Sequence, residues 1–595
     1  MHEATELRAK RDEDRLLLLV AGLGGLLYGV DVGIIGGALP YLEATMRLTA
    51  GQLSVIVAAV LLGSVLSTLF AGMLADWLGR KPLMTLSGLA FVLSIPVIAL
   101  SHGYGPLFLG RLLQGVSGGL IGVVVPLYLA ECLSASHRGK GTAAFQWLLT
   151  LGIFVAAVIG IYYSYRVEAV ASIADPATVF MFKDQAWRRI FWVSLPPGIL
   201  FVIGSLFVAE SPRWLFAQGK PEQAYAALLR SRTQERADLE LAEMRQTLLA
   251  KATNTSGKPT GGSLLQRRYV FPFLLACTIL FCNTATGVNS LIGYNTSILL
   301  QSGLSDVYAH WGYVVFTFIN FATTIGGMAL VDRKGRRFLF ILGTVGLTVC
   351  LICIGLLFLK TERLSLECNR IVQSMVGGDQ TLTLTFDAGE ADKLLTALGY
   401  LGSEIKSNHA SLAVIYSYGG FTAATSFVRS DDRGATPIQI TREACVPTNK
   451  VEAFFKNPFA NLDAARTAPL KIDRALIGQI PDARNGWLVA AGLYLFIAFY
   501  ALGPGVCVWL ALSELMPTRI RSNGMSIALV INQLVATTLA GIFLPVVSKC
   551  GYSTMFFIFS GFGALYLMTV TFFLPETKGK TLEEIAHYFE TASGQ

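Results

Sequence analysis

The sequence predicts an all-α membrane protein with twelve transmembrane helices arranged as two six-helix halves. Three observations support this fold class: the composition is apolar, about twelve apolar runs are long enough to cross a bilayer, and two charged loops occur twice. Of the 595 residues, 53% are hydrophobic and only 14% are charged, and the mean hydropathy is +0.56. This balance lies far outside that of a soluble domain.

Most of the apolar runs are near the ~20 residues that span the hydrocarbon core as a helix. They lie near 16–40, 53–75, 82–101, 106–130, 143–164, 188–209, 270–300, 311–331, 337–359, 485–513, 522–546 and 552–574. The first run follows a charged start without a small-residue cleavage site, so we expect a retained helix and not a signal peptide. The two halves are expected at 16–210 and at 269–360 with 485–575, joined by a linker with short helices at 211–268.

Two loop sequences are repeated, so the chain contains a duplicated unit. GMLADWLGRK (72–81) recurs as GMALVDRKGRR (327–337), and ECLSASHR (131–138) recurs as ELMPTRIR (514–521). The offsets of the two pairs, about 256 and about 383 residues, indicate that about 127 residues entered the second half between the loops. The polar stretch 361–484 matches this insert, and TLTLTF, ADKLLTALGYL and SLAVIYSY in it predict a strand, a helix and a strand of a small α/β domain.

The loop charges predict the orientation in the membrane. The net charge is +8, but the basic residues cluster between apolar runs, as the positive-inside rule expects of cytoplasmic loops, so no nucleic-acid partner is needed. We expect a multi-pass protein of the cell membrane with the segments 1–15 and 576–595 both cytoplasmic, and the insert outside. The insert has no Asn-x-Ser/Thr acceptor, which favours a bacterial inner membrane.

Cysteines and polar clusters in the insert offer little other chemistry. Seven of the nine cysteines fall in or beside the apolar runs, whereas Cys368 and Cys445 share the insert and would form a disulfide if that side is oxidising. The insert contains no nucleophile–base set and no metal-ligand cluster. We therefore expect neither an enzyme nor a metal or cofactor site.

Six motifs in chain order resemble the sugar porter family of the major facilitator superfamily, and in particular its proton-coupled symporters. Besides the four repeated loops they are ESPRWL (210–215) and PETKG (575–579). The resemblance implies the major facilitator fold, a monomer, and alternating access to a site at the midplane. It also implies a cytoplasmic gate whose charges pair across the two halves when the inner side is closed. The gate residues are Asp76, Arg80, Glu131, Arg138, Glu210, Asp332, Arg336, Glu514, Arg521 and Glu576.

The resemblance implies a substrate site of amides and one indole. Its residues are Gln146, Asn283, Asn289, Asn320, Trp509 and Asn532. Such groups suit a polyhydroxylated ring, although an interhelical hydrogen bond without ligand is the alternative for each amide. In span seven Asn283 and Thr284 replace two glutamines of the family pattern, and Gly293 replaces a tyrosine. The motifs therefore leave the identity of the substrate open among a monosaccharide, an inositol and another polyol.

An aspartate inside the first apolar run stands apart from this set. At 1.5 Å per residue, Asp31 lies about 23 Å from the cytoplasmic end of span one, and Arg111 lies about 30 Å from that face in span four. An intramembrane acid and base at similar depth are expected to pair. Proton-coupled sugar porters have an aspartate in this GxDxG context, so the resemblance implies proton coupling by Asp31 and Arg111. A permanent structural ion pair is the alternative. No histidine lies well inside a predicted span, so no histidine relay is expected.

Together these patterns predict a secondary transporter that imports a monosaccharide or polyol by proton symport, with the lipid bilayer and protons as its other partners. One alternative is a transporter of the same fold that works as a passive uniporter. The other alternative, from a different functional class, is a sugar sensor. A sensor would be expected to carry a long cytoplasmic tail, and only KTLEEIAHYFETASGQ follows PETKG. This short tail disfavours sensing.

Overall fold

The computed structural model describes the backbone of residues 2–133, 135–254, 267–399, 407–432, 437–516, 521–576 and 578. Within these residues, eleven helical segments are long and apolar enough to cross a membrane. The last of them, Ile527–Phe572, contains Gly551 at φ 86° and ψ 164°, where the backbone is not helical. This segment therefore comprises two spans, and the predicted twelve-span fold is confirmed.

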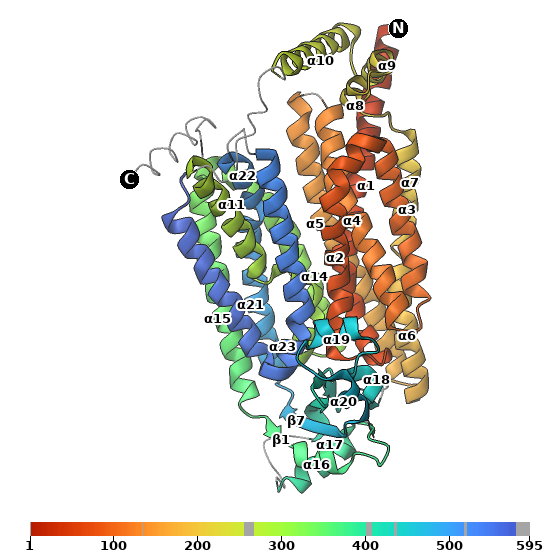
Figure 1. Cartoon of the computed structure of the whole chain (residues 1–595), viewed down its shortest axis with the longest axis vertical. Coiled ribbons are helices and arrows are strands. Elements are labelled where there is room, and N and C mark those ends of the chain that lie inside the picture. Colours follow the sequence, from red (N-terminus) through yellow and green to blue (C-terminus); the bar gives the residue numbers. More distant parts are fainter. Residues whose placement is uncertain are drawn as a thin grey trace.

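The N-terminal half, drawn in red to orange in Figure 1, contains six spans. Local signals explain several helix starts: Thr49 and Gln52 form a capping box at α2, and the Asp175 side chain caps α6 before a proline. The sixth span bends between α6 and α7. The helices of the N-terminal half are α1 His2–Thr45, α2 Ala50–Leu78, α3 Arg80–Ala99, α4 Tyr104–Cys132, α5 Ala135–Ala171, α6 Pro176–Trp192 and α7 Leu195–Phe207.

Glycines allow the helices of this half to approach closely. A Cβ on Gly29 of α1 would lie 1.9 Å from the carbonyl oxygen of Leu149 in α5. A Cβ on Gly115 of α4 would lie 2.0 Å from the carbonyl oxygen of Val60 in α2. No other residue fits at these positions, so the glycine-rich sequence of the fourth span serves helix packing.

Three helices follow the first half: α8 Pro212–Ala217, α9 Pro221–Ser231 and the longer α10 Gln234–Asn254. They lie at the same end of the bundle as the start of α1, at the top of Figure 1. We call this end the linker end and the opposite end, which carries residues 361–484, the insert end.

The C-terminal half contains the remaining six spans, of which two are broken. Gly287 adopts a left-handed conformation between α11 and α12, and Gly503 with Pro504 separates α21 from α22. The helices of this half are α11 Arg267–Ala285, α12 Val288–Gly293, α13 Asn295–Gln301, α14 Asp306–Lys334, α15 Arg336–Glu362, α21 Ala483–Leu502, α22 Pro504–Leu515 and α23 Arg521–Phe572.

The insert forms two antiparallel sheets with short helices around its own apolar core. The long strands β3 Ala410–Tyr418 and β7 Leu470–Gln479 pair with each other, and β1 Leu366–Glu367, β4 Phe421–Ala424 and β5 Val428–Arg429 join them. β2 Leu382–Leu384 and β6 Ile438–Ile440 form the second sheet. The helices are α16 Asn369–Ser374, α17 Ala388–Ala397, η1 Ser407–His409, α18 Arg442–Cys445, α19 Lys450–Lys456 and α20 Leu462–Thr467.

The structure corrects the expected disulfide of the insert. Cys368 and Cys445 are both free and buried. The Cys368 thiol donates to the carbonyl oxygen of Ala475 on β7, and the Cys445 thiol donates to that of Phe421 on β4. Since β3 lies between β7 and β4, the two thiols contact different strands of the sheet. Burial raises the pKa of Cys368 to about 12, which keeps this thiol protonated and unreactive.

The apolar cores show which end of the bundle is closed. One cluster of buried residues joins both halves at the insert end, including Leu39 and Ile56 of the first half and Leu299 and Phe543 of the second. At the linker end each half has a separate cluster of its own. The two halves are therefore packed together at the insert end, below which the insert lies.

Candidate functional site

An acid and a base meet inside the first half. Asp31 of α1 and Arg111 of α4 are each 1% exposed, and the Asp31 Oδ1 atom lies 3.9 Å from the Arg111 Nη1 atom. Neither oxygen of Asp31 has a hydrogen-bond partner among the described residues. The guanidinium donates instead to Gln114, at 2.6 Å, and lies over the ring of Phe191. The expected pair is thus present but loosely bonded, and Gln114 is a partner to which no sequence motif points.

A glycine of α4 packs closely against this pair. A Cβ on Gly118 of α4 would lie 2.9 Å from the Asp31 Oδ2 atom. Any larger residue at this position would push the carboxylate away from its place. Glycine at position 118 therefore allows the Asp31 carboxylate to lie directly against α4.

The amides of the predicted substrate site hold the helices of the second half together. Asn283 of α11 donates from its Nδ2 atom to the hydroxyl of Tyr500 at 3.2 Å, and Thr284 donates to the Oδ1 atom of Asn532. The Oδ1 atom of Asn283 has no partner among the described residues. Asn283 thus presents one unused acceptor in the interior, and Tyr500, in the sequence FYALGPG, is a contact that the sequence analysis did not include.

The other amides lie on neighbouring helices. Gln146 of α5 and Asn289 of α12 are partly exposed, and Asn320 of α14 is 8% exposed. Each of Gln146 and Asn320 is followed by an aromatic residue, and these two rings, Trp147 and Phe321, lie 5.5 Å apart. Gln146 and Asn320 therefore lie where the two halves face each other. The side chain of Trp509 lies outside the part of the chain that the structure describes.

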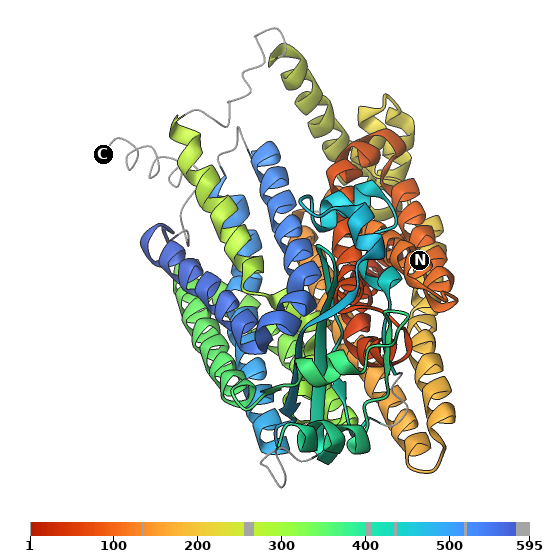
Figure 2. The same ribbon diagram turned by 60° about the horizontal axis from the view of Figure 1, so that its bottom comes forward.

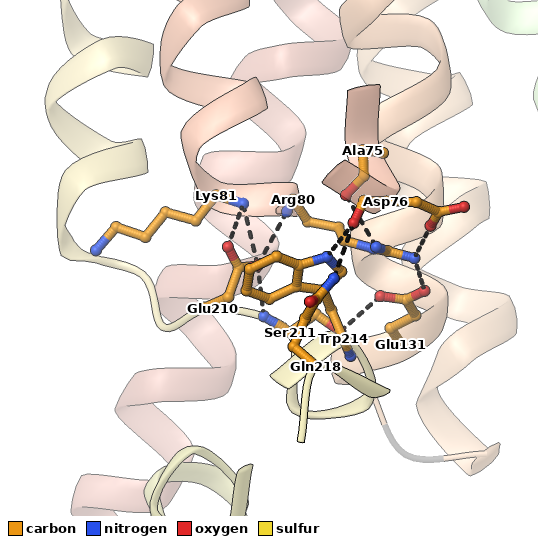
Figure 3. Close-up of polar contacts among 9 residues, drawn as sticks. All are labelled: Ala75, Asp76, Arg80, Lys81, Glu131, Glu210, Ser211, Trp214 and Gln218. Atoms are coloured by element: carbon orange, nitrogen blue, oxygen red, sulfur yellow. Dashed lines mark hydrogen bonds and ion pairs between the residues drawn. The ribbon is translucent and has the colours of Figure 1, made fainter. Parts of the chain in front are cut away.

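The gate residues of the first half surround the start of α3. Glu210 accepts hydrogen bonds from the backbone amides of Arg80, Lys81 and Ser211, as Figure 3 shows. A Cβ on Gly79 would lie 2.4 Å from the Glu210 carboxylate. Burial raises the pKa of Glu210, and these amide hydrogen bonds oppose the rise. Glu210 therefore caps the helix end with a charge that the helix dipole favours.

The side chain of Arg80 connects this cap to other helices. Its Nη2 atom lies 2.8 Å from Glu131 of α4 and 3.1 Å from Asp76 of α2. Glu131 also accepts from the hydroxyl of Ser211 at 2.5 Å. The indole of Trp214 in α8 donates to the backbone of Asp76 (Figure 3). The first linker helix is thus bonded to the linker end of the first half.

The second half repeats the arrangement. Glu576 accepts from the amides of Arg336 and Arg337, and the Arg336 guanidinium lies 3.1 Å from Glu514. A Cβ on Gly335 would lie 2.6 Å from Glu576. The pairs of Arg80 and Arg336 with these glutamates each lie inside one half. Pairs between the halves are expected only when the linker end is closed, and in this structure the halves have separate cores at that end. The side chains of Arg138, Asp332 and Arg521 lie outside the described part of the chain.

One histidine differs from the sequence expectation. Helix α14 begins at Asp306, so His310 lies in its first turns within a membrane span and is fully buried. Its Nε2 atom lies 3.1 Å from the carbonyl oxygen of Gly37, and its ring stacks on that of Tyr41. The predicted span started one residue too late to include it. His310 belongs to the closed contact between the halves at the insert end, and it meets α1 at Gly37 and Tyr41, beyond Asp31 along the helix.

Known proteins resemble this chain over nearly its whole length. A family model described as "Sugar (and other) transporter" matches residues 17–377 and 476–589, leaving out most of the insert. The human proton myo-inositol cotransporter is 26% identical over 601 residues, 99% of this chain and 84% of that protein. The glucose transporter GlcP of Staphylococcus epidermidis is 24% identical over 584 residues, covering 97% of this chain and 98% of that protein. The xylose transporter XylE of E. coli in its inward open conformation shares the fold, with a TM-score of 0.63 at 19% identity, over 96% of this chain and 98% of that one.

Proposed function

Because this chain belongs to the sugar porter family of the major facilitator superfamily, we propose that it imports a monosaccharide or polyol together with a proton. It is a sugar transporter and not an enzyme. The proton-coupled mode and the class of sugar are the proposal. In this mechanism the two halves rock about a central site, which opens first to one side of the membrane and then to the other.

The observation that carries the proposal is the loose pair of Asp31 and Arg111. A buried carboxylate is expensive unless it is paired and hydrogen-bonded. Asp31 has an ion pair at 3.9 Å and no hydrogen bond among the described residues, so a small separation of α1 from α4 would leave its charge without compensation. Taking up a proton removes that cost. The protonation of Asp31 is thereby coupled to the distance between two helices.

The amides supply the recognition of the solute. The free acceptor of Asn283, the partly exposed Gln146 and Asn289, and the nearby Asn320 offer donors and acceptors without a net charge. Such a set matches the hydroxyl groups of a neutral sugar or polyol. The relatives named as transporters of inositol and glucose are consistent with this class of solute.

We propose that the linker end faces the cytoplasm of a cell membrane. Basic residues gather at this end, at Arg80 and Lys81 and again at Arg336 and Arg337. The positive-inside rule places such residues on the cytoplasmic side. Since the halves are joined at the insert end, the structure then corresponds to a transporter that is closed toward the outside.

Proton coupling is tested with protein reconstituted in liposomes, using radiolabelled myo-inositol, D-glucose and D-xylose. We expect accumulation of at least one of them when the outside is made acidic. Asp31→Asn is expected to abolish accumulation and to retain exchange of labelled for unlabelled sugar. Asp463→Asn, which changes an exposed carboxylate of the insert, is the control and should accumulate normally. Exchange without accumulation by the unchanged protein would identify a passive uniporter.

The substrate site is tested with Gln146→Ala. Loss of one or two hydrogen bonds is expected to weaken sugar binding about tenfold, while the melting temperature in detergent stays within about 2 °C. An unchanged affinity would remove Gln146 from the site.

A further inference from the structure

The insert is a covalent part of the second half. The chain leaves α15 at Glu362 and returns to α21 at Ala483, and both helices belong to that half. Further bonds strengthen the connection. The Arg429 guanidinium donates to the carbonyl oxygen of Leu300, in the last turn of α13, at 2.6 Å and to that of Leu304, which follows α13, at 3.2 Å. When the halves move, the insert must therefore move with the second half.

The insert also contacts the first half, to which it has no covalent connection. The Lys183 ammonium of α6 forms an ion pair with Asp432, in which Lys183 is 9% exposed and Asp432 33% exposed. The Arg47 guanidinium, which follows α1, donates to Gln439 of β6 at 2.9 Å. We call these two contacts the latch. Figure 2 shows the insert lying over the ends of both halves.

A chamber of about 390 Å³ lies between the insert and the insert end of the bundle. Tyr41 and Glu43 line it from the first half, Asp306 and Tyr552 from the second, and Phe427 from the insert. Its volume falls within the range of small-molecule sites. Lys183, Asp432, Arg47 and Gln439 also belong to its wall, so the latch closes one side of the chamber.

Direct bonds between the halves lie beside the chamber. Asp306 of α14 accepts hydrogen bonds from Tyr41 at 2.7 Å and from Ser164 at 2.5 Å. Tyr313 donates to the carbonyl oxygen of Gly33 at 2.8 Å. Opening this end of the central path must break these bonds. Because the insert moves with the second half, the same motion must also break the latch.

We propose that the insert is a moving outer gate, carried by the second half and fastened to the first by the Lys183–Asp432 and Arg47–Gln439 contacts. Each transport cycle opens the latch, exposes the chamber and lets solute reach the central path. The latch favours the state that is closed at the insert end, because its bonds exist only in that state. This inference rests on the proposed alternating-access transport.

Cross-linking of the latch tests whether the insert is a moving outer gate. Lys183→Cys with Asp432→Cys, in a background of Cys353→Ser and Cys550→Ser that removes the exposed native thiols, places two cysteines across the latch. The lysine side chain spans more than a disulfide can, so the two thiols are bridged with a bifunctional methanethiosulfonate reagent. The bridge is expected to reduce sugar exchange in liposomes at least about tenfold, and dithiothreitol to restore it. The matched control is Glu367→Cys with Arg474→Cys, an ion pair of 2.9 Å inside the insert, whose cross-linking should change nothing. Full exchange by the bridged latch protein, with the cross-link verified by mass spectrometry, would overturn the inference.

The labelling of a cysteine tests, without any transport assay, whether the insert opens as an outer gate. Ser426 lines the chamber, and Ser426→Cys in the same background provides a reporter thiol. Adding Asp432→Asn is expected to increase its rate of reaction with a membrane-impermeant maleimide about tenfold, because a weaker latch opens more often. An unchanged rate would contradict the gate. Failure of the unchanged protein to exchange any of the three sugars would instead contradict the proposed function, and the labelling result would still test the gate.

Discussion

The Asp31 carboxylate lies 3.9 Å from the Arg111 guanidinium, whereas the same guanidinium lies 2.6 Å from the amide oxygen of Gln114. The arginine is thus held on its own helix by Gln114, three residues further along α4. Among the described residues, Asp31 has this ion pair and no hydrogen bond. This asymmetry allows α1 to move relative to α4 without dislodging the arginine, as the proposed proton coupling requires.

A double-mutant cycle measures the pair. Arg111→Leu leaves the Asp31 charge buried without a partner and is expected to cost about 3–5 kcal/mol of stability. The double variant Asp31→Asn with Arg111→Leu should recover a large part of this loss, because no uncompensated charge remains. The melting temperatures of the purified proteins in detergent rank the stabilities of the unchanged protein, Arg111→Leu and the double variant. A double variant no more stable than Arg111→Leu would show that Asp31 is already uncharged in the folded protein at that pH.

Much of this site was predictable from the sequence for simple reasons. Helical rise alone placed Asp31 and Arg111 at compatible depths, and the two residues lie on packed helices. The repeated loops predicted equivalent positions for Arg80 and Arg336, and each of these arginines binds a glutamate of the other repeated loop, Glu131 and Glu514.

Other features depend on contacts that no local pattern encodes. Strand β7 pairs with β3 across about sixty residues, and β2 joins β6 and not β3, so the sheets of the insert could not be derived from three predicted elements. The bond between Asn283 and Tyr500 depends on the crossing of α11 and α21. The gate charges pair inside each half because the halves are apart at the linker end, and a sequence does not specify which state is observed.

The start of helix α3 at Gly79 provides a test of the predicted cytoplasmic gate, in which Glu210 caps this helix. Gly79 has φ 100°, and a Cβ there would lie 2.4 Å from the Glu210 carboxylate. Gly79→Ala combines backbone strain with displacement of this cap, and we expect a loss of about 2–4 kcal/mol with a lower melting temperature. Gly72→Ala is the control, because nothing lies within 4 Å of a Cβ there, in the interior of α2. Equal melting temperatures for both variants would contradict the cap.

The state of the insert thiols is tested by counting them. All nine cysteines are free, including the buried Cys368 and Cys445. Protein that is purified without reductant, then unfolded in guanidinium chloride, should react with nine equivalents of a thiol reagent. A count lower by two that dithiothreitol restores would indicate a disulfide. The variant Cys368→Ser identifies it, since removing one partner of the disulfide frees the other.

The contact between Tyr500 and Asn283 predicts an effect on affinity. Tyr500 accepts the only hydrogen bond that is described for the Asn283 side chain, at 3.2 Å, and leaves the Asn283 oxygen available. Tyr500→Phe removes this support, so the amide loses its fixed orientation. We expect sugar binding to weaken about fivefold, the equivalent of ~1 kcal/mol for one hydrogen bond. Tyr308→Phe, at a tyrosine that is 55% exposed, is the control and should bind normally. Because both variants lose only a hydroxyl, equal affinities in isothermal titration would show that the orientation of Asn283 does not contribute to sugar binding.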